Sequence, residues 1–175
     1  MKNYYYTLAA LETIRLGEKI PITEEHFLQF AEDTIDAKGY QILLRCRWGL
    51  TEPTGFNFAD RILFWEKELR LELAKARILK LPFDIPPNLQ ASDGSYSLLE
   101  QVRAVMALDS PLDAELYLDQ LRWSFLEEAG TRYYFDLEAL IVYYLKLQLA
   151  VRRNKLHEEL GRDTFKKEYA ALADS

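Results

Sequence analysis

The spacing of apolar residues predicts that this chain is built from helices. The clearest pattern begins at Asn57 and lasts until Pro82, and its apolar side chains recur every three or four residues: Ile62, Trp65, Leu69, Leu73 and Ala76. That period places them on one face of a helix. We expect Asn57 to cap this helix, with Asp60 in its first turn. Glu66 and Arg70 are four residues apart and predict an ion pair on its flank.

The same reasoning predicts helices along most of the remaining chain. Thr23 and Ser110 are suited to cap helices, and Pro111 fits the first position of the second of these. We expect Gly39 and Gly161 to end the helices that precede them. The predicted segments are 24–35, 40–48, a helix from Ser95 or Ser97 to about Leu108, 110–128, 135–160 and a short amphipathic tail at 163–173.

Only the opening segment is ambiguous, because Tyr4 to Arg15 fits either a strand or a short helix. Strand-like alternation is absent after these first residues. The chain is therefore predicted to be all-α, a bundle of six to seven helices. A length of 175 residues suits a single domain over 1–175. The segment 82–94 contains three prolines and is a candidate connector between subdomains.

Two of the predicted helices share a sequence pattern. The segments 69–77 and 145–153 both read leucine, basic, leucine, glutamate or glutamine, leucine, alanine, two free positions and arginine. Asp60 and Asp136 lie in register upstream of these segments. One interpretation is a pair of related helical units, and the other is chance, because these residue types are common helix formers.

Charge and cysteine content narrow the classes of partner. The chain has 22 basic and 28 acidic residues, a formal net charge of −6, and no long basic stripe. Such a field repels a phosphate backbone, so we expect no nucleic-acid partner. A single cysteine, Cys46, fits a reducing cytoplasm. The longest apolar run, Ala139 to Leu145, is too short to span a bilayer, so we expect no direct membrane insertion.

The residues that carry common chemistry are sparse. His26 and His157 are the only histidines, and neither belongs to a metal-binding motif. No phosphate-binding glycine loop is present. Cys46 lies between Arg45 and Arg47, which would favour a thiolate, but a small buried side chain is the more common role for a free cysteine. We therefore expect no metal, no cofactor and no enzymatic activity, with a Cys46 enzyme kept as an alternative.

Binding to another protein is the better prediction. Aromatic residues make up 13% of the chain, and tyrosine and tryptophan are favoured in protein contacts. Tyr143 and Tyr144 are adjacent, so they cannot share one helix face. The candidate interface residues, each of which also has a plain role as a solvated or inter-helix side chain, are Arg70, Arg77, Tyr143, Lys146 and Arg153.

Two short segments resemble a known family. The runs Asn3 to Leu11 (NYYYTLAAL) and Phe56 to Asp60 (FNFAD) are similar to a bacterial family of unknown function. Genes of that family typically lie inside operons for V-type (A/V-type) ATPases. The resemblance implies a role alongside such an ATPase.

The second half separately resembles the C subunit of V-type ATPases, the counterpart of the eukaryotic d subunit. The similarity lies in the run Tyr134 to Leu140 (YFDLEAL), followed by Lys146 and the pair Arg152-Arg153. The C subunit is a funnel-shaped, all-helical protein built from repeated units, and it seats the central stalk on the membrane ring. This chain is much shorter, so a full set of repeats does not fit. The resemblance supplies no catalytic residue.

These resemblances favour one function among three. We expect a non-catalytic subunit or assembly factor of a V-type ATPase, an adaptor similar to the C subunit, whose partners are the central stalk or the membrane sector. We expect it in the cytoplasm, with peripheral attachment to the inner membrane through the ATPase as a further option. The alternatives are a stand-alone helical interaction module or regulator unrelated to the ATPase and, less favoured, an enzyme that would use Cys46 or a pair of carboxylates.

Overall fold

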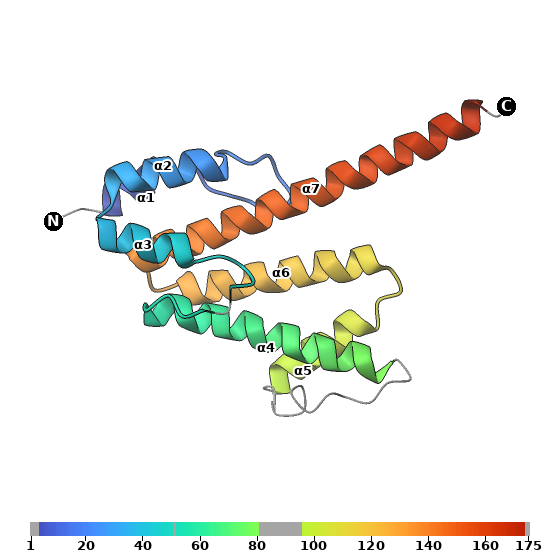
Figure 1. The fold of residues 1–175 in the computed structure, drawn as a ribbon, viewed down its shortest axis with the longest axis horizontal. Helices are drawn as coiled ribbons and strands as arrows, with labels where there is room; N and C mark the ends of the chain where they lie inside the picture. Colours follow the sequence, from blue (N-terminus) through green and yellow to red (C-terminus); the bar gives the residue numbers. More distant parts are fainter. Residues whose placement is uncertain (1–3, 51, 81–95, 174–175) are drawn as a thin grey trace.

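The computed structural model describes residues 4–50, 52–80 and 96–173, with side chains up to residue 156 apart from that of Tyr96. These ranges contain seven helices and no strand, which confirms the predicted all-α bundle (Figure 1). The predicted connector at 82–94 lies outside the described residues. The helices are α1 (Tyr4–Ala10), α2 (Glu24–Thr34), α3 (Ala37–Arg45), α4 (Asn57–Leu79), α5 (Tyr96–Met106), α6 (Pro111–Gly130) and α7 (Leu137–Ala173).

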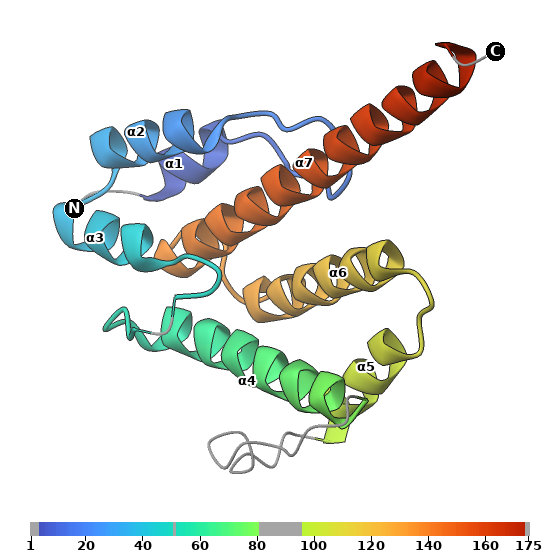
Figure 2. The same cartoon turned by 45° about the vertical axis from the view of Figure 1, so that its right-hand side comes forward.

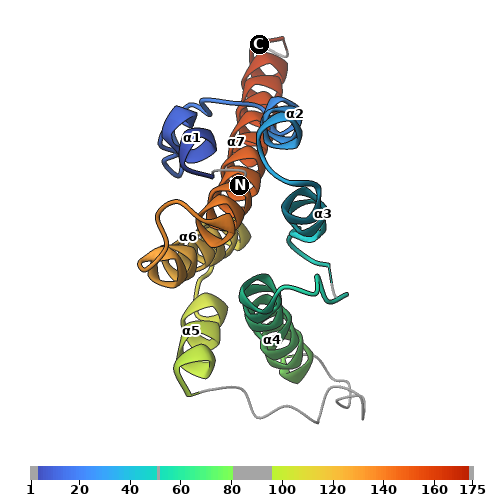
Figure 3. The same cartoon turned by 90° about the vertical axis from the view of Figure 1, so that its left-hand side faces the viewer.

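The helices pack around two hydrophobic clusters. The larger cluster joins α1, α2 and α3 to α7, with contributions from the start of α4 and the end of α6. Its largest fully buried side chains include Phe27 and Tyr144, whose rings stack 5.2 Å apart. The smaller cluster joins the later part of α4 to α5 and α6 around Leu69, Leu98 and Leu118. In Figures 2 and 3, α6 lies between the α7 side of the molecule and the α4–α5 side.

Side-chain caps fix where several helices begin. The Thr23 hydroxyl accepts a hydrogen bond from the His26 amide, and the Ser110 hydroxyl accepts one from the Asp113 amide, which confirms both predicted caps. Asp136 caps α7 by accepting from the Ala139 amide. Each cap satisfies a backbone donor that the first turn of a helix leaves without an intrahelical partner.

The first three helices settle the conformation of the opening segment and correct the predicted role of Gly39. The ambiguous opening is helical, although it ends at Ala10 rather than near Arg15. Gly39 does not break a helix: Asp36 begins α3 and accepts from the Gly39 amide at 2.9 Å. A side chain at position 39 would overlap the Tyr4 hydroxyl, which donates to Asp36 at 2.7 Å. The glycine thus permits a close approach between α1 and α3.

The start of α4 also differs from the prediction. Asn57 is the first helical residue, and Phe56 occupies the cap position without a side-chain hydrogen bond. Asp60 instead accepts from the backbone amide and the hydroxyl of Thr54, at 2.6 and 2.7 Å. Asp60 and Asp136, which match in the two similar segments, therefore make different bonds, and the duplication stays a prediction.

The last helix is longer than predicted. Helix α7 continues through Gly161 to Ala173, so the expected break and separate tail are wrong. A glycine inside a helix costs only about 1 kcal/mol relative to alanine, too little to end a helix that the residues on both sides favour. All three ribbon views show the C-terminal part of α7 projecting beyond the other helices (Figures 1, 2 and 3).

Candidate interaction site

A pocket rich in arginine lies where α4, α6 and α7 meet the segment that follows α3. Its volume is about 440 Å³. Five of its lining side chains are cations, from four different parts of the fold: Arg47, Arg70, Arg122, Arg152 and Lys155. Glu24 is its one acidic lining residue, and we call this feature the arginine pocket. A larger depression of about 520 Å³ has two residues of each charge sign instead, Glu52 and Asp60 against Arg61 and Lys67.

A buried carboxylate on α4 supports the pocket from behind. Glu66 is only 2% exposed and accepts two hydrogen bonds from Arg122, both at 2.9 Å. It also accepts from Arg70 Nε at 2.6 Å. The predicted Glu66–Arg70 pair is therefore present, but Glu66 lies in the protein interior rather than on the flank. A bidentate guanidinium pair of this kind fixes the geometry of both partners.

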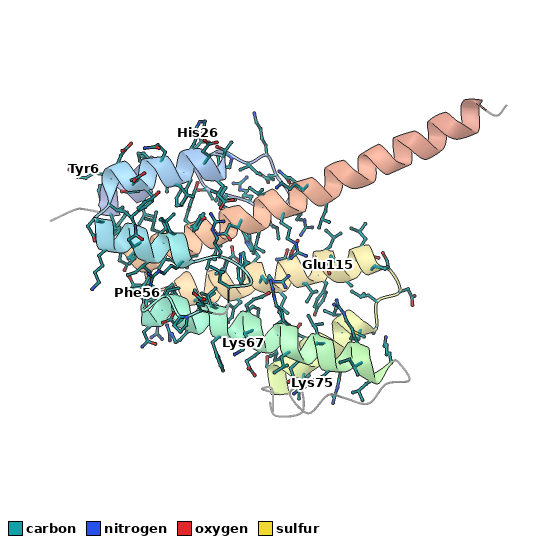
Figure 4. The ribbon with its side chains drawn as sticks, viewed as in Figure 1. Tyr6, His26, Phe56, Lys67, Lys75 and Glu115 are labelled. Carbon is teal, nitrogen blue, oxygen red and sulfur yellow. The ribbon has the colours of Figure 1, made fainter. Side chains whose placement is uncertain are left out.

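A second buried carboxylate connects α6 to α7. Asp119 is fully buried, and its Oδ1 atom accepts from Arg122 at 3.4 Å and from Arg152 at 3.2 Å. Arg152 also donates to Glu115 on α6, which is labelled in Figure 4. Burial raises the pKa of Asp119, while the charges of Arg152 and Arg122 oppose that rise. The Asp119 Oδ2 atom has no hydrogen-bond partner within the described residues.

The segment after α3 is clamped onto α7. The Gln148 side chain donates to the Cys46 carbonyl at 2.9 Å and accepts from the Trp48 amide at 3.3 Å. The Trp48 indole donates to the Leu145 carbonyl at 2.9 Å. These bonds join residues about a hundred positions apart and hold Arg47 at the edge of the pocket, where it lies 3.6 Å from Glu24.

Gly49 completes this wall. It adopts φ +89°, a left-handed conformation that favours glycine, and a side-chain carbon there would come within 2.8 Å of Arg70 Nη1. The absence of a side chain lets the Arg70 guanidinium lie directly against the backbone. Arg70 is thereby held between Glu66 and the segment that carries Arg47.

Of the five candidate interface residues, the structure brings only Arg70 to this pocket. Arg77 is exposed near the end of α4, and Lys146 lies 4.6 Å from the centre of the Trp123 ring and 3.3 Å from Glu127. Arg153 is partly buried, and its Nε and Nη1 atoms have no hydrogen-bond partner in the described part of the chain.

Tyr143 serves a packing role. Its ring stacks on Phe27, its hydroxyl donates to the Glu12 carbonyl at 3.0 Å, and burial raises its pKa to about 12. Tyr143 and Tyr144 both reach Phe27 although they are adjacent. The tyrosines with free surface are others, among them Tyr6 and Tyr134.

Among the residues considered for chemistry, the structure describes the side chains of Cys46 and His26. Cys46 is fully buried, its thiol donates to the Ile42 carbonyl, and burial raises its pKa to about 12, so the neighbouring arginines do not generate a thiolate. His26 is exposed on α2 (Figure 4), and the His157 side chain lies outside the description. No group of three metal-ligating side chains occurs among the described residues. Within the same ranges, each helix is too short or too polar to cross a membrane.

The sequence contains a signal for Glu66 and Arg122, whose buried pairing was not predicted. Glu66 occupies the apolar stripe of α4 between Ile62 and Leu69, and Arg122 lies four residues from both Leu118 and Leu126 on α6. A charged residue on an apolar stripe predicts a buried partner of opposite charge. The partner itself could not be named, because Glu66 and Arg122 are 56 residues apart in sequence.

Fold and site together define a helical protein with a charged pocket at the meeting point of its helices. The chain belongs to a family of unknown function: the family model described as "Protein of unknown function (DUF2764)" matches residues 87–174. That range includes α5, α6, α7 and the pocket residues Arg122, Arg152 and Lys155. No curated protein and no solved structure matches the chain.

Proposed function

We propose that this protein is a non-catalytic subunit or accessory protein of a V-type ATPase. It would act as an adaptor similar to the C subunit, between the central stalk and the membrane sector, located in the cytoplasm and held peripherally at the inner membrane by that complex. The link to the ATPase rests on the sequence resemblances. The proposal that it is not an enzyme draws support from the buried, protonated Cys46.

The observation that carries the adaptor role is the shape of α7. This helix has 37 residues, and its first half lies in the main core while its end projects beyond the other helices (Figures 1 and 2). Isolated helices gain little stability in water, and most helices are stabilised by packing against another surface. A helix anchored at one end and extended at the other suits a protein that joins two bodies.

Rigidity at the anchored end supports the same role. The Glu66–Arg122–Asp119–Arg152 chain of ion pairs connects α4 and α6 through buried groups and reaches α7 at the partly exposed Arg152. Buried bidentate pairs hold helices in one relative geometry, which an adaptor between moving and stationary parts requires.

Co-purification tests the proposal. The tagged protein is isolated in mild detergent from the cells that encode it, and bound proteins are identified by mass spectrometry. Recovery of the A and B subunits of the ATPase and of its membrane-sector proteins in fixed ratio supports the adaptor. A pure protein without them, from a lysate that contains them, would leave the stand-alone interaction module as the better interpretation.

A further inference from the structure

The arginine pocket concentrates positive charge on an acidic protein. The whole chain has a net charge of −6, yet five cations line this one pocket. Four carboxylates pair with cations of this pocket: the buried Glu66 and Asp119, and the partly exposed Glu24 and Glu115. Arg153, whose charge also acts on Asp119, is a further cation of this group, so the cations outnumber the carboxylates and the region suits an anionic ligand group.

Four of the five cations form two layers with different roles, and the fifth, Arg152, is paired with Glu115 and Asp119. The inner layer is Arg122, whose side chain is 5% exposed and whose Nε, Nη1 and Nη2 groups all donate to Glu66 or Asp119. The outer layer consists of Arg47, Arg70 and Lys155. The side chains of Arg47 and Arg70 are 52% and 50% exposed, and Lys155 is exposed at the rim.

The outer layer retains donors for a ligand. Arg70 donates to Glu66 through Nε only, and within the described residues its two Nη groups make no hydrogen bond. Arg47 makes one long ion pair of 3.6 Å with Glu24 and also interacts with the Tyr144 hydroxyl, which leaves part of its five-donor guanidinium for a ligand. Guanidinium groups bind carboxylates through paired N–H donors, so this layer is able to receive an oxyanion while the inner layer holds its position.

The rest of the lining selects among anions. Apolar surface comes from Val151, Leu156 and the Trp48 ring, whereas Leu149 is buried. A phosphate has no apolar part, whereas an acidic side chain beside an apolar one matches both the excess of positive charge and the apolar wall.

We infer that the arginine pocket binds a glutamate or aspartate side chain from an acidic, partly apolar segment of a partner protein. The carboxylate lies between Arg47, Arg70 and Lys155, and an apolar neighbour packs on Val151 and Leu156. The identity of the partner as an ATPase component rests on the proposed function, but the ligand chemistry does not.

Nuclear magnetic resonance on the full chain tests this inference. The chain has three tryptophans, and of these only Trp48 lines the pocket, so its indole signal reports occupancy, with Trp65 and Trp123 as internal references. The probe is a capped tetrapeptide, leucine-glutamate-glutamate-leucine. Its glutamine counterpart and inorganic phosphate serve as controls at the same ionic strength. Arg47→Gln with Lys155→Gln removes two outer cations, and Arg45→Gln is the matched control at an exposed position outside the pocket.

We expect a saturable shift of the Trp48 signal with the glutamate peptide, and binding at least about tenfold weaker in the double variant but unchanged in Arg45→Gln. Equal binding of the glutamine peptide, equal binding by the double variant or tighter binding of phosphate would each overturn the inference. So would the lack of a saturable shift. Binding of the glutamate peptide as expected, without ATPase proteins in the co-purification, would reject only the proposed function. Co-purification of ATPase proteins without peptide binding would reject only the inference about the arginine pocket.

Discussion

At the residue scale, the main feature of this protein is a pair of buried carboxylates held by arginines. Glu66 and Asp119 are 2% and 0% exposed, and Arg122 contacts both. Removing charges from water is costly, so such groups are stable in the interior only while their partners stay in place. The stability of the contact between α4 and α6 therefore depends on Arg122 more than on any exposed ion pair.

A double-mutant cycle tests this dependence. Arg122→Met leaves Glu66 with only the half-exposed Arg70, and we expect it to lower the free energy of unfolding by about 3–5 kcal/mol. Glu66→Met should also destabilise, but the double variant should lose clearly less than the two single losses together. Urea unfolding followed by circular dichroism measures the free energy of unfolding of the two single variants and of the double variant. Strictly additive losses would show that Glu66 and Arg122 do not depend on one another.

The Gln148 clamp makes a second residue-scale prediction. Gln148→Met removes the hydrogen bonds to Cys46 and Trp48, so the Trp48 amide should exchange with solvent faster, at a cost of about 1–2 kcal/mol in stability. Gln41→Met, at an exposed position on α3, is the control. Hydrogen exchange measured residue by residue tests this prediction. Equal protection of the Trp48 amide in the two variants would contradict the clamp.

At the scale of helices, the start of α3 should depend on pH. The Gly39 amide first, and then the Tyr4 hydroxyl, lower the pKa of Asp36 below its ordinary value of 3.8. The ionised carboxylate therefore adds stability above pH 3.8, and this contribution is lost as the pH falls through the lower, folded-state value. Asp36→Asn keeps a capping oxygen but removes the titration.

We thus expect the difference in unfolding free energy between wild type and Asp36→Asn to be largest near neutral pH and to shrink below pH 3.8. Asp36→Ala should cost about 1 kcal/mol through loss of the cap. Urea unfolding from about pH 3 to about pH 7 measures both effects. A wild-type advantage that grows as the pH falls would show that the carboxylate is not stabilised by its ionised form.

Gly161 allows a test of the continuous α7. Gly161→Ala should raise the helical signal in circular dichroism, and Gly161→Pro should lower it, because alanine favours a helix interior and proline interrupts it. Neither change should move the main urea transition, since the two hydrophobic clusters contain no residue beyond Val151 among those whose side chains are described. A large loss of stability with Gly161→Pro would mean that the end of α7 supports the core.

Helix positions followed from the sequence better than helix limits did. The apolar periods of α2 and α4 and the caps at Thr23 and Ser110 were sufficient to place three helices, because these are local signals. Gly39 and Gly161 were misleading for two reasons. The Asp36 cap places Gly39 in the first turn of α3, and a single glycine costs too little to end α7 at Gly161. The arginine pocket was outside the reach of local patterns, since it joins Arg47, Arg70 and Arg152 from distant parts of the chain.

At the scale of the whole molecule, the fold combines a rigid body with a projecting helix. The ion-pair chain and the two hydrophobic clusters stabilise the body, and the arginine pocket opens where α7 passes α4 and α6. Helix α7 thus contributes to the lining of the pocket and also forms the projecting end. A partner held at each would be joined through one continuous helix, which is the arrangement that the proposed adaptor needs.

The most direct test of that role is a reciprocal purification through the ATPase. The catalytic polypeptide of the ATPase is tagged in the cells that encode this protein, and the complex is isolated in mild detergent after light cross-linking. We predict that the protein co-purifies in a fixed ratio to the tagged polypeptide, and that cross-links connect it to the central stalk or the membrane sector. An intact ATPase that lacks the protein, while the protein is abundant in the same lysate, would contradict the account.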